Sequence, residues 1–324
     1  MCTCIHTPGS VPLFGRNLDL QSAYGETLVL YPRNAPLPLR HGTALSQHYA
    51  MLGAARVEHD FPLFFDAVNE HGLAIAGLNF PQFCIYPAVK ETGDCLASFE
   101  LTPCILGTCR TTAEAKARLA HITITDTPFS PALPPTPLHF MIADGKDCIV
   151  VESTSDGLHV YDNPVHVMTN SPAFPYHLQH LQEYLNVTAA PAVNRFSDAL
   201  ALHAAGCGMG GKGLPGDLSS SSRFVRAAFA ASNRPIDNEP QTAIAHFFHM
   251  LAFVAFPRGC VLLENGQDEH TVYSCCMDLM EKTYYYTTYE NSALTAVRMD
   301  FARLNDDRLT VYGMPRSIQI TRLR

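Results

Sequence analysis

Two Asp-Gly pairs, Asp144-Gly145 and Asp156-Gly157, each separate short apolar runs in the middle of the chain. An Asp-Gly pair between apolar segments favours the two-residue turn of a β-hairpin, because these residues tolerate the positive φ angles that such a turn requires. The runs concerned are LHFMIAD, CIVVEST and LHVYDN, and VHVMTN follows them. Antiparallel strands are therefore predicted here.

The first eighty residues are also rich in strand-like segments. The predicted strands are CTCIHT, LFGRNLDL, TLVLYPR, YAMLGAAR and the two arms of FFDAVNEHGLAIAGLNF. In the last of these, the Asn69 to Gly72 loop joins two apolar runs as a hairpin. Three more strands are predicted near the other end of the chain, at VYSCCMDLM, TYYYTTYE and ALTAVRMD.

Helical patterns alternate with these strand regions. The predicted helices cover 98–109, 111–122, 174–185, 197–206, 221–232 and 242–254, and the second begins with Thr111 and Glu114 at capping-box spacing. Prolines at 128–137 predict a loop or lid. Blocks of strands that alternate with blocks of helices favour an α+β fold over a parallel βαβ sheet. We predict two antiparallel sheets flanked by helices, in a single domain over 1–324.

Composition restricts the partners and the location. The net charge is −8, and the 22 Lys and Arg residues form no run, which argues against a nucleic-acid surface. No secretory signal pattern appears, and the apolar stretch at 246–256 is too short to span a bilayer. A soluble cytoplasmic protein with a small-molecule partner is expected. The eleven cysteines are interpreted as reduced thiols, and since they form no paired C-x-x-C motifs, no metal and no cofactor are expected.

The sequence begins MCTCI, with a thiol at the second position. Removal of Met1 would place the Cys2 thiol and a free α-amine on one residue. Their reference pKa values, about 8.5 and about 8, are close enough for the amine to take the thiol proton. Cys2 is thus a candidate nucleophile with its own base, although a cysteine at this position is also compatible with a small apolar residue entering a strand.

Five segments in order resemble one known family: MCTCI, FGRNLD, VNEHGLAIAGLNFP, VHVMTNSP and GKGLPGDLSSSSRF. They resemble the choloylglycine hydrolase family, the N-terminal-nucleophile hydrolases that include bile salt hydrolases and penicillin V acylases. The resemblance covers nearly the whole chain. It implies a four-layer αββα fold and hydrolysis of a non-peptide amide bond, in which the Cys2 sulfur forms a thioester with the acyl group.

The same resemblance implies roles for two residues of the second strand. Arg16 would place a fixed positive charge beside the Cys2 sulfur, and Asp19 would hold the free α-amine. The alternative for Arg16 is a structural salt bridge with an acid such as Asp19. Because they are three positions apart, strand alternation places them on opposite faces unless a bulge intervenes.

Three further residues match family positions. Asn170, as a side-chain donor, and Asn79, through its backbone N–H, would form the oxyanion hole, and Arg223 would support developing negative charge. Taken alone, Asn170 is typical of a turn before Ser-Pro, and Arg223 is typical of a solvated helix start.

The substrate expectation also depends on the resemblance. Asn79 in GLNFP is similar to the bile-salt branch, so hydrolysis of glycine or taurine conjugates of bile acids is favoured, with penicillin V or acyl homoserine lactones as the alternative. A catalytically silent ligand-binding relative would be favoured if Met1 persisted. An apolar wall for the acyl group, or simply protein core, is predicted from Leu18, Phe61, Phe65 and Leu133. The segment GMGGKGLPGDLSS resembles the family's assembly segment, which implies a homotetramer.

Overall fold

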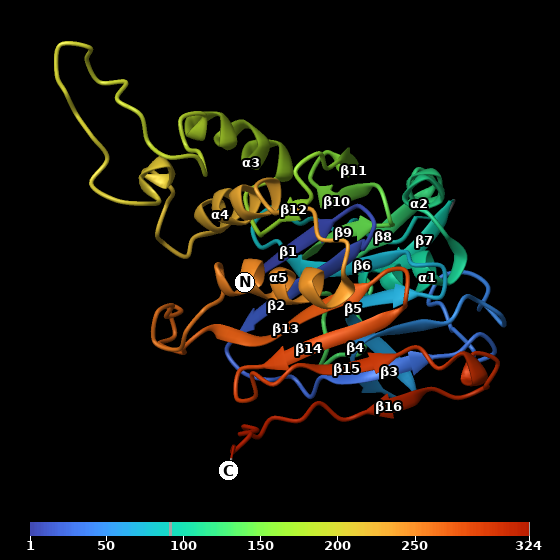
Figure 1. The fold of residues 1–324 in the computed structure, drawn as a ribbon. Helices are drawn as coiled ribbons and strands as arrows, with labels where there is room; N and C mark the ends of the chain where they lie inside the picture. The colour runs from blue at the N-terminus through green and yellow to red at the C-terminus, as the bar shows by residue number, and fades with distance from the viewer. Residues whose placement is uncertain (91–92, 324) are drawn as a thin grey trace.

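The structure is a computed structural model that describes residues 1–90 and 93–323. Two large antiparallel sheets lie face to face at its centre (Figure 1). The first has six strands in the order β12 (Val167–Met168), β1 (Cys2–Thr7), β2 (Leu13–Leu20), β13 (His270–Asp278), β14 (Thr283–Thr288) and β15 (Thr295–Arg298). Both edges of β1 are therefore paired.

The second sheet has eight strands and contains the predicted hairpins. Their order is β11 (Gly157–Asp162), β10 (Cys148–Thr154), β9 (Leu138–Ala143), β6 (Ala74–Asn79), β5 (Phe61–Asn69), β4 (Met51–Glu58), β3 (Thr27–Tyr31) and β16 (Thr310–Tyr312). The two Asp-Gly turns connect β9 to β10 and β10 to β11 as predicted. The Asn69 to Gly72 loop joins β5 to β6.

Helices cover the outer faces of the two sheets (Figure 1). On the six-stranded sheet, α4 (Ser220–Ser232) contacts β1 and β12, and α5 (Pro240–Ala252) contacts β13 and β2. On the other sheet, α1 (Leu101–Thr108) contacts β5 and β6. The remaining helices are α2 (Thr112–Leu119) and α3 (Phe174–His180), with short 3-10 turns at Ser98–Glu100, Leu181–Tyr184, Met209–Gly211 and Phe301–Arg303. This arrangement confirms the four-layer αββα fold.

Apolar side chains fill the layers on both sides of each sheet. One cluster, which includes Phe14, Leu52 and Met141, extends through the layer between the sheets and beneath α4 and α5. A second, which includes Ile75 and Ile105, lies between the eight-stranded sheet and α1. Since β1 and the centre of β2 are buried on both faces, their sequences show few exposed polar positions.

Most predicted elements are confirmed, but the helix predicted over 197–206 is wrong. That segment has no regular helix in the structure, and the Asn194 side chain donates to the backbone carbonyls of Ser197 and Leu200. Such local bonds compete with helix formation, and exposed Leu200 and Leu202 supply no packing to favour it. Two features were not predicted: strand β16, and the parallel pair of β7 (Asp94–Ala97) with β8 (Ile122–Thr125).

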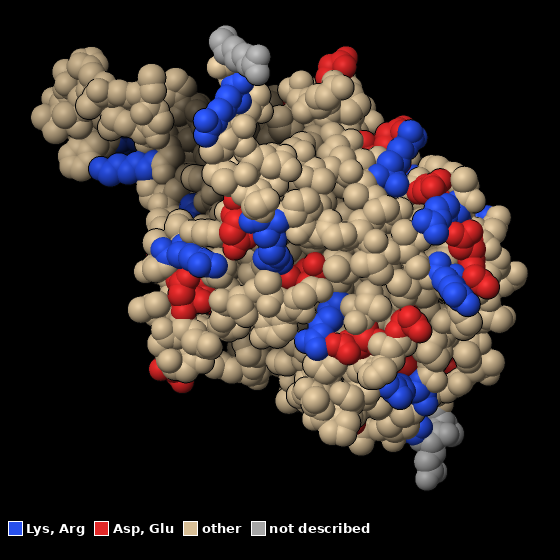
Figure 2. Space-filling model, turned by 90° about the horizontal axis from the view of Figure 1, so that it is seen from below, with Lys and Arg blue, Asp and Glu red and all other residues tan. Residues whose placement is uncertain are grey.

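The surface carries charges of both signs. On the face seen in Figure 2, basic and acidic side chains are interspersed among uncharged residues. No helix within the described ranges has both the length and the apolar character that crossing a bilayer requires.

Candidate active site

Cys2 is the first residue of β1 and lies deep in the six-stranded sheet. It pairs with Leu18 of β2, and only 2% of its surface is exposed. Its side chain points toward the layer between the sheets, where the Arg16 guanidinium donates a short hydrogen bond to its sulfur. The nucleophile candidate is therefore fixed by its pairing with β2 and by a buried cation.

Arg16 is completely buried, and its second terminal nitrogen anchors it to the opposite sheet. Nη1 donates to the carbonyls of Phe65 and Gly77, at 3.2 and 2.5 Å. Burial alone would lower the pKa of Arg16, but the neighbouring Cys2, Tyr273 and Asp66 raise it above its usual value. Arg16 thus provides a permanent positive charge against the sulfur and forms no ion pair with Asp19, both residues lying in the described part of the chain.

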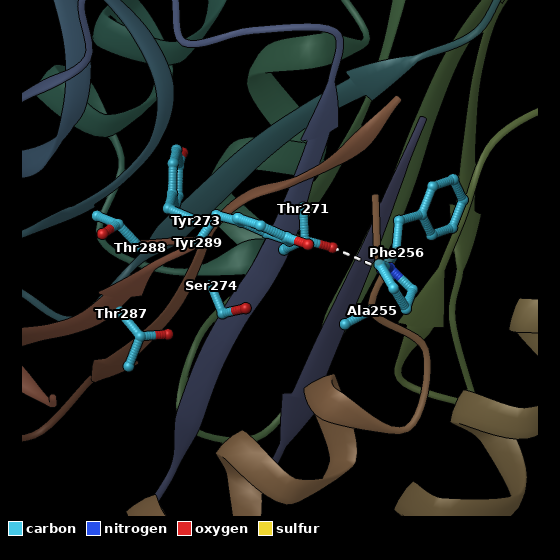
Figure 3. A pocket seen from close by; sticks show the side chains of 9 residues that line it. Ala255, Phe256, Thr271, Tyr273, Ser274, Thr287, Thr288 and Tyr289 are labelled. Carbon is cyan, nitrogen blue, oxygen red and sulfur yellow. Dashed lines mark hydrogen bonds between the residues drawn. The ribbon is translucent and has the colours of Figure 1, made fainter. Parts of the chain in front are cut away.

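Asp19 lies on the other face of β2, as strand alternation predicts. Its Oδ1 accepts a 2.6 Å hydrogen bond from Thr271 in β13, whose hydroxyl accepts in turn from the Phe256 N–H at 2.8 Å (Figure 3). The β-bulge lies in β13, between Thr271 and Tyr273, and leaves β2 regular. Arg16 and Asp19 therefore extend from opposite faces of β2, Arg16 toward the Cys2 sulfur and Asp19 toward Thr271.

The amino terminus is bound beside this aspartate. The Met1 amine donates to the Asp19 carbonyl at 2.7 Å and pairs with the buried carboxylate of Glu269. Burial lowers the pKa of this amine. Burial also raises the pKa of Asp19, against the opposing effects of the amino terminus and Arg223. Asp19 Oδ2 is buried without a hydrogen-bond partner within the described residues.

Asn170 and Arg223 form a hydrogen-bonded group around the Cys2 backbone. The Cys2 N–H donates to Asn170 Oδ1 at 2.8 Å, and Arg223 Nη2 donates to the same oxygen at 2.8 Å. Arg223 Nη1 also donates to the Cys2 carbonyl and to Thr3 Oγ1, at 2.5 and 2.7 Å. Arg223 in α4 is fully buried, which lowers its pKa to about 10. It is not a solvated helix-start residue.

Asn79 enters the site through its backbone. Phe80 donates to Pro137 on the β9 side, so the alternate residues Gly77 and Asn79 direct their backbone groups to the opposite edge of β6. There the Gly77 carbonyl accepts from Arg16, and the Asn79 carbonyl accepts from Asn170 Nδ2 at 2.7 Å. The six matching residues are thus brought together around Cys2.

A cavity of about 350 Å³ opens beside the Cys2 sulfur. Its walls are mainly apolar and include Leu18, Phe65, Phe129 and Leu133 of the proline-rich loop. Phe61 does not line it. This side chain is buried in the second core cluster, where its ring packs against Phe99 and Phe129, which do line the cavity.

Sequence reasoning missed a buried acid behind Arg16. Asp66 of β5 accepts hydrogen bonds from the hydroxyls of Tyr273 and Tyr284, the second at 2.6 Å, and burial raises its pKa. The tyrosines come from the other sheet, so the three residues connect the sheets next to Arg16. Thr271 was also missed. No local pattern marks these residues, since their partners are distant in sequence.

Comparison with known proteins assigns this arrangement to a family. Residues 2–312 match the family described as linear amide C-N hydrolases, choloylglycine hydrolase family. The chain belongs to the choloylglycine hydrolase family. It is 39% identical over 314 residues to the bile salt hydrolase/transferase of Lactiplantibacillus plantarum, with 97% of each chain covered.

Solved structures agree with this membership. The fold is similar to the conjugated bile acid hydrolase of Clostridium perfringens, with a TM-score of 0.93, 33% identity and 100% of both chains covered. A penicillin V acylase from Agrobacterium tumefaciens matches with a TM-score of 0.76 and 21% identity, covering 96% of this chain and 90% of that one. The second likeness shows the shared fold alone.

A buried histidine beneath Asn170 predicts acid sensitivity. His177 Nε2 donates to the Asn170 carbonyl at 2.9 Å, and burial lowers the pKa of His177 to about 4. The unfolded chain takes up this proton below about pH 6.5. Between these values the unfolded state binds more protons, so the free energy of unfolding falls as pH falls, by up to about 1.4 kcal/mol per pH unit.

Urea denaturation at several pH values between 7 and 4 measures this dependence. We expect His177→Gln, which cannot titrate, to give a shallower slope by up to one proton. His203→Gln changes an exposed histidine and should leave the slope unaltered. An identical slope in the His177 variant and the parent chain would contradict the assignment.

Proposed function

We propose that this protein hydrolyses the amide bond of glycine- or taurine-conjugated bile acids, with Cys2 as nucleophile after Met1 is removed. The observation that carries the proposal is the Cys2 sulfur, held by Arg16 in the wall of an apolar cavity. Relatives named bile salt hydrolase/transferase and conjugated bile acid hydrolase, 34–39% identical, support the substrate class.

The α-amine of processed Cys2 acts as the base. It occupies the position of the Cys2 backbone nitrogen, which donates to Asn170 Oδ1 in a buried residue. Burial favours the neutral amine, as it does for the Met1 amine. The unpartnered Asp19 Oδ2 then accepts a hydrogen bond from the amine and orients it. Arg16 stabilises the thiolate.

The reaction proceeds through a thioester. The amine takes the thiol proton, the sulfur attacks the acyl carbon, and the amine returns the proton to the leaving nitrogen as the C–N bond breaks. Water then attacks the thioester, and the free bile acid leaves as the thiol re-forms. The oxyanion accepts hydrogen bonds from the second N–H of Asn170 Nδ2 and from the Asn79 N–H. Arg223, which donates to Asn170, keeps that amide in position.

The cavity wall fits the acyl part of such a substrate. Leu18 and Phe65 lie next to the nucleophile, and Leu133 belongs to the loop across the cavity. A steroid acyl group presents a broad apolar face, which this lining would remove from water. Penicillin V acylase activity is the second candidate because it shares the fold, but that neighbour is only 21% identical.

The first test combines intact mass with product analysis. We expect the purified protein to lack Met1 and to release free glycine or taurine from glycocholate and taurocholate. Penicillin V is the comparison substrate, and we expect much slower release from it. A processed chain that cleaves penicillin V and neither bile salt would overturn the proposed substrate.

The protein is also proposed to be a cytoplasmic homotetramer that acts in bile-lipid metabolism. An extended arm formed by residues 186–208 projects from the body beside α3 and α4 (Figure 1). Exposed apolar side chains on or next to this arm include Leu185 (84% exposed), Val193 and Phe196 (82% exposed). Side chains of this kind commonly become buried against other subunits.

Light scattering of the purified protein tests this assembly. We expect a mass of four chains for the parent protein and smaller species for Phe196→Ser. Ile236→Ser is a matched control, because Ile236 is equally exposed but lies between α4 and α5. A monomeric parent protein would refute the homotetramer.

A further inference from the structure

A second group of reactive side chains lies at the far end of β1 from Cys2. His6, Cys148 and His166 come from β1, from β10 and from the segment before β12. Their donor atoms all lie within 4.8 Å of one another. In the part of the chain that the structure describes, this is the only set of three His, Cys, Asp or Glu side chains gathered closely enough to bind a metal ion.

The spacing of the donor atoms is close to that of a tetrahedral zinc site. His6 Nδ1 and His166 Nδ1 are 3.0 Å apart, and Cys148 Sγ is 3.4 Å from His166 Nδ1. With Zn–N near 2.0 Å and Zn–S near 2.3 Å, tetrahedral ligands lie about 3.3 to 3.6 Å from each other. A small adjustment of these side chains would therefore accommodate the ion. Two imidazoles and a thiolate form a donor set typical of Zn²⁺.

The surroundings favour neutral histidines with available lone pairs. His6 is fully buried, and burial together with the neighbouring His166 lowers its pKa to about 3. Its Nε2 is buried and has no hydrogen-bond partner within the described residues. Moving the His6 proton to Nε2 would present Nδ1 to a metal, and the ion would replace the hydrogen bond between the two Nδ1 atoms.

The cluster also has a path to solvent and compensating charge. Cys148 and His166 line a surface hollow of about 330 Å³, together with Asp147, Asp162, Lys116 and Lys146. Asp144 and Asp147 lie close enough to raise the pKa of Cys148, while burial is the larger cause of that rise. A bound divalent cation would instead lower the pKa of Cys148, and the thiolate and nearby carboxylates would offset the charge of the ion.

We propose that His6, Cys148 and His166 bind one Zn²⁺ ion, with water at the fourth position. Binding releases the Cys148 thiol proton to solvent and forms one Zn–S and two Zn–N bonds. The paired-cysteine argument from the sequence does not apply to this site, because its ligands come from three distant segments. Since His6 and Cys148 belong to different sheets, the ion would join the two sheets next to β12.

The test uses a chain that lacks the proposed nucleophilic thiol and the two exposed thiols. Cys2, Cys207 and Cys260 are replaced by alanine together, because the first is the nucleophile and the other two are exposed. Equilibrium titration with Zn²⁺ should then show one bound ion per chain and a melting temperature raised by several degrees. Co²⁺ should give the near-ultraviolet absorption of a cobalt–thiolate bond.

Two ligand variants locate the ion. Cys148→Ala should abolish the cobalt–thiolate absorption, and His166→Asn should weaken Zn²⁺ binding by more than about 100-fold. Asn suits position 166, where the backbone is left-handed with φ 59°, so this variant should fold. His59→Asn is the matched control, since His59 is also left-handed, with φ 52°, and is exposed.

The outcomes are distinct from those of the bile-salt assay. Saturable binding that is lost in the two ligand variants and kept in His59→Asn supports the site. Absence of a cobalt–thiolate absorption in the triple-alanine chain overturns it, whether or not the variants fold. Zn²⁺ binding that survives Cys148→Ala also overturns it. Because Cys2 is absent from this chain, none of these results depends on hydrolysis.

Discussion

Cys2→Ala is expected to abolish hydrolysis of conjugated bile acids and to leave the fold intact. Alanine keeps a small residue at the start of β1, so the strand pairing with Leu18 and the removal of Met1 are preserved. The sulfur alone is lost, and with it the atom that we propose attacks the acyl carbon. Release of amino acid should fall to background, while the melting temperature changes by a few degrees at most.

Cys2→Ser gives the more informative comparison. The hydroxyl occupies nearly the same position beside Arg16, but an alkoxide is far harder to generate at neutral pH than a thiolate. We expect most of the rate to disappear with no change in substrate affinity. Both variants should be checked by intact mass for loss of Met1. Parent-level turnover by Cys2→Ala would refute the nucleophile assignment.

Asn170→Ala is expected to reduce kcat by about 100- to 1000-fold, the usual effect of removing one oxyanion donor. The structure gives a second reason for a large effect. Asn170 Oδ1 accepts from both Cys2 and Arg223, so its loss would leave the buried Arg223 cation with one fewer partner. Some loss of thermal stability is therefore expected alongside the loss of rate.

Asn170→Asp removes the oxyanion donor while keeping an acceptor for Arg223. The carboxylate retains an acceptor for Arg223 and Cys2 but lacks the N–H donors of Nδ2. We expect Arg223 to keep its acceptor, but some stability to be lost because the carboxylate oxygen that replaces Nδ2 faces the Asn79 carbonyl, and we expect kcat to be reduced at least as strongly as in Asn170→Ala. Steady-state kinetics and thermal denaturation measure the two quantities independently. A kcat for Asn170→Asp near the parent value would exclude the side-chain donor from the oxyanion hole.

The sequence was sufficient to predict those parts of the fold that depend on local pattern. Asp-Gly turns and apolar runs predicted β9, β10 and β11, and the Thr111 cap predicted the start of α2, where Thr111 accepts from the Glu114 N–H. The helix predicted over 197–206 failed because its apolar residues have no surface of the same chain to pack against. Helical pattern without burial contributes little stability.

Some residues of the candidate site could likewise be predicted from the sequence, and others could not. Cys2, Arg16 and Asp19 lie close together in sequence, and alternation alone correctly placed the last two on opposite faces of β2. Asn170 and Arg223 were identified by resemblance only, since no periodicity relates them to Cys2. The Asp66 group and the Thr271 contact required the structure, because buried polar partners are selected by tertiary packing.

Because β1 is paired along both edges, Met1 must be removed before this strand is fully docked. In the folded chain the Met1 amine is bound by the Asp19 carbonyl and Glu269, so the amino terminus is not free to bind an aminopeptidase. Trimming of Met1 therefore competes with docking of the first strand. When synthesis outpaces trimming, we expect a well-folded, inert fraction that no later exposure to the peptidase restores. The specific activity of the purified protein would then be lower when the cell had synthesised it faster.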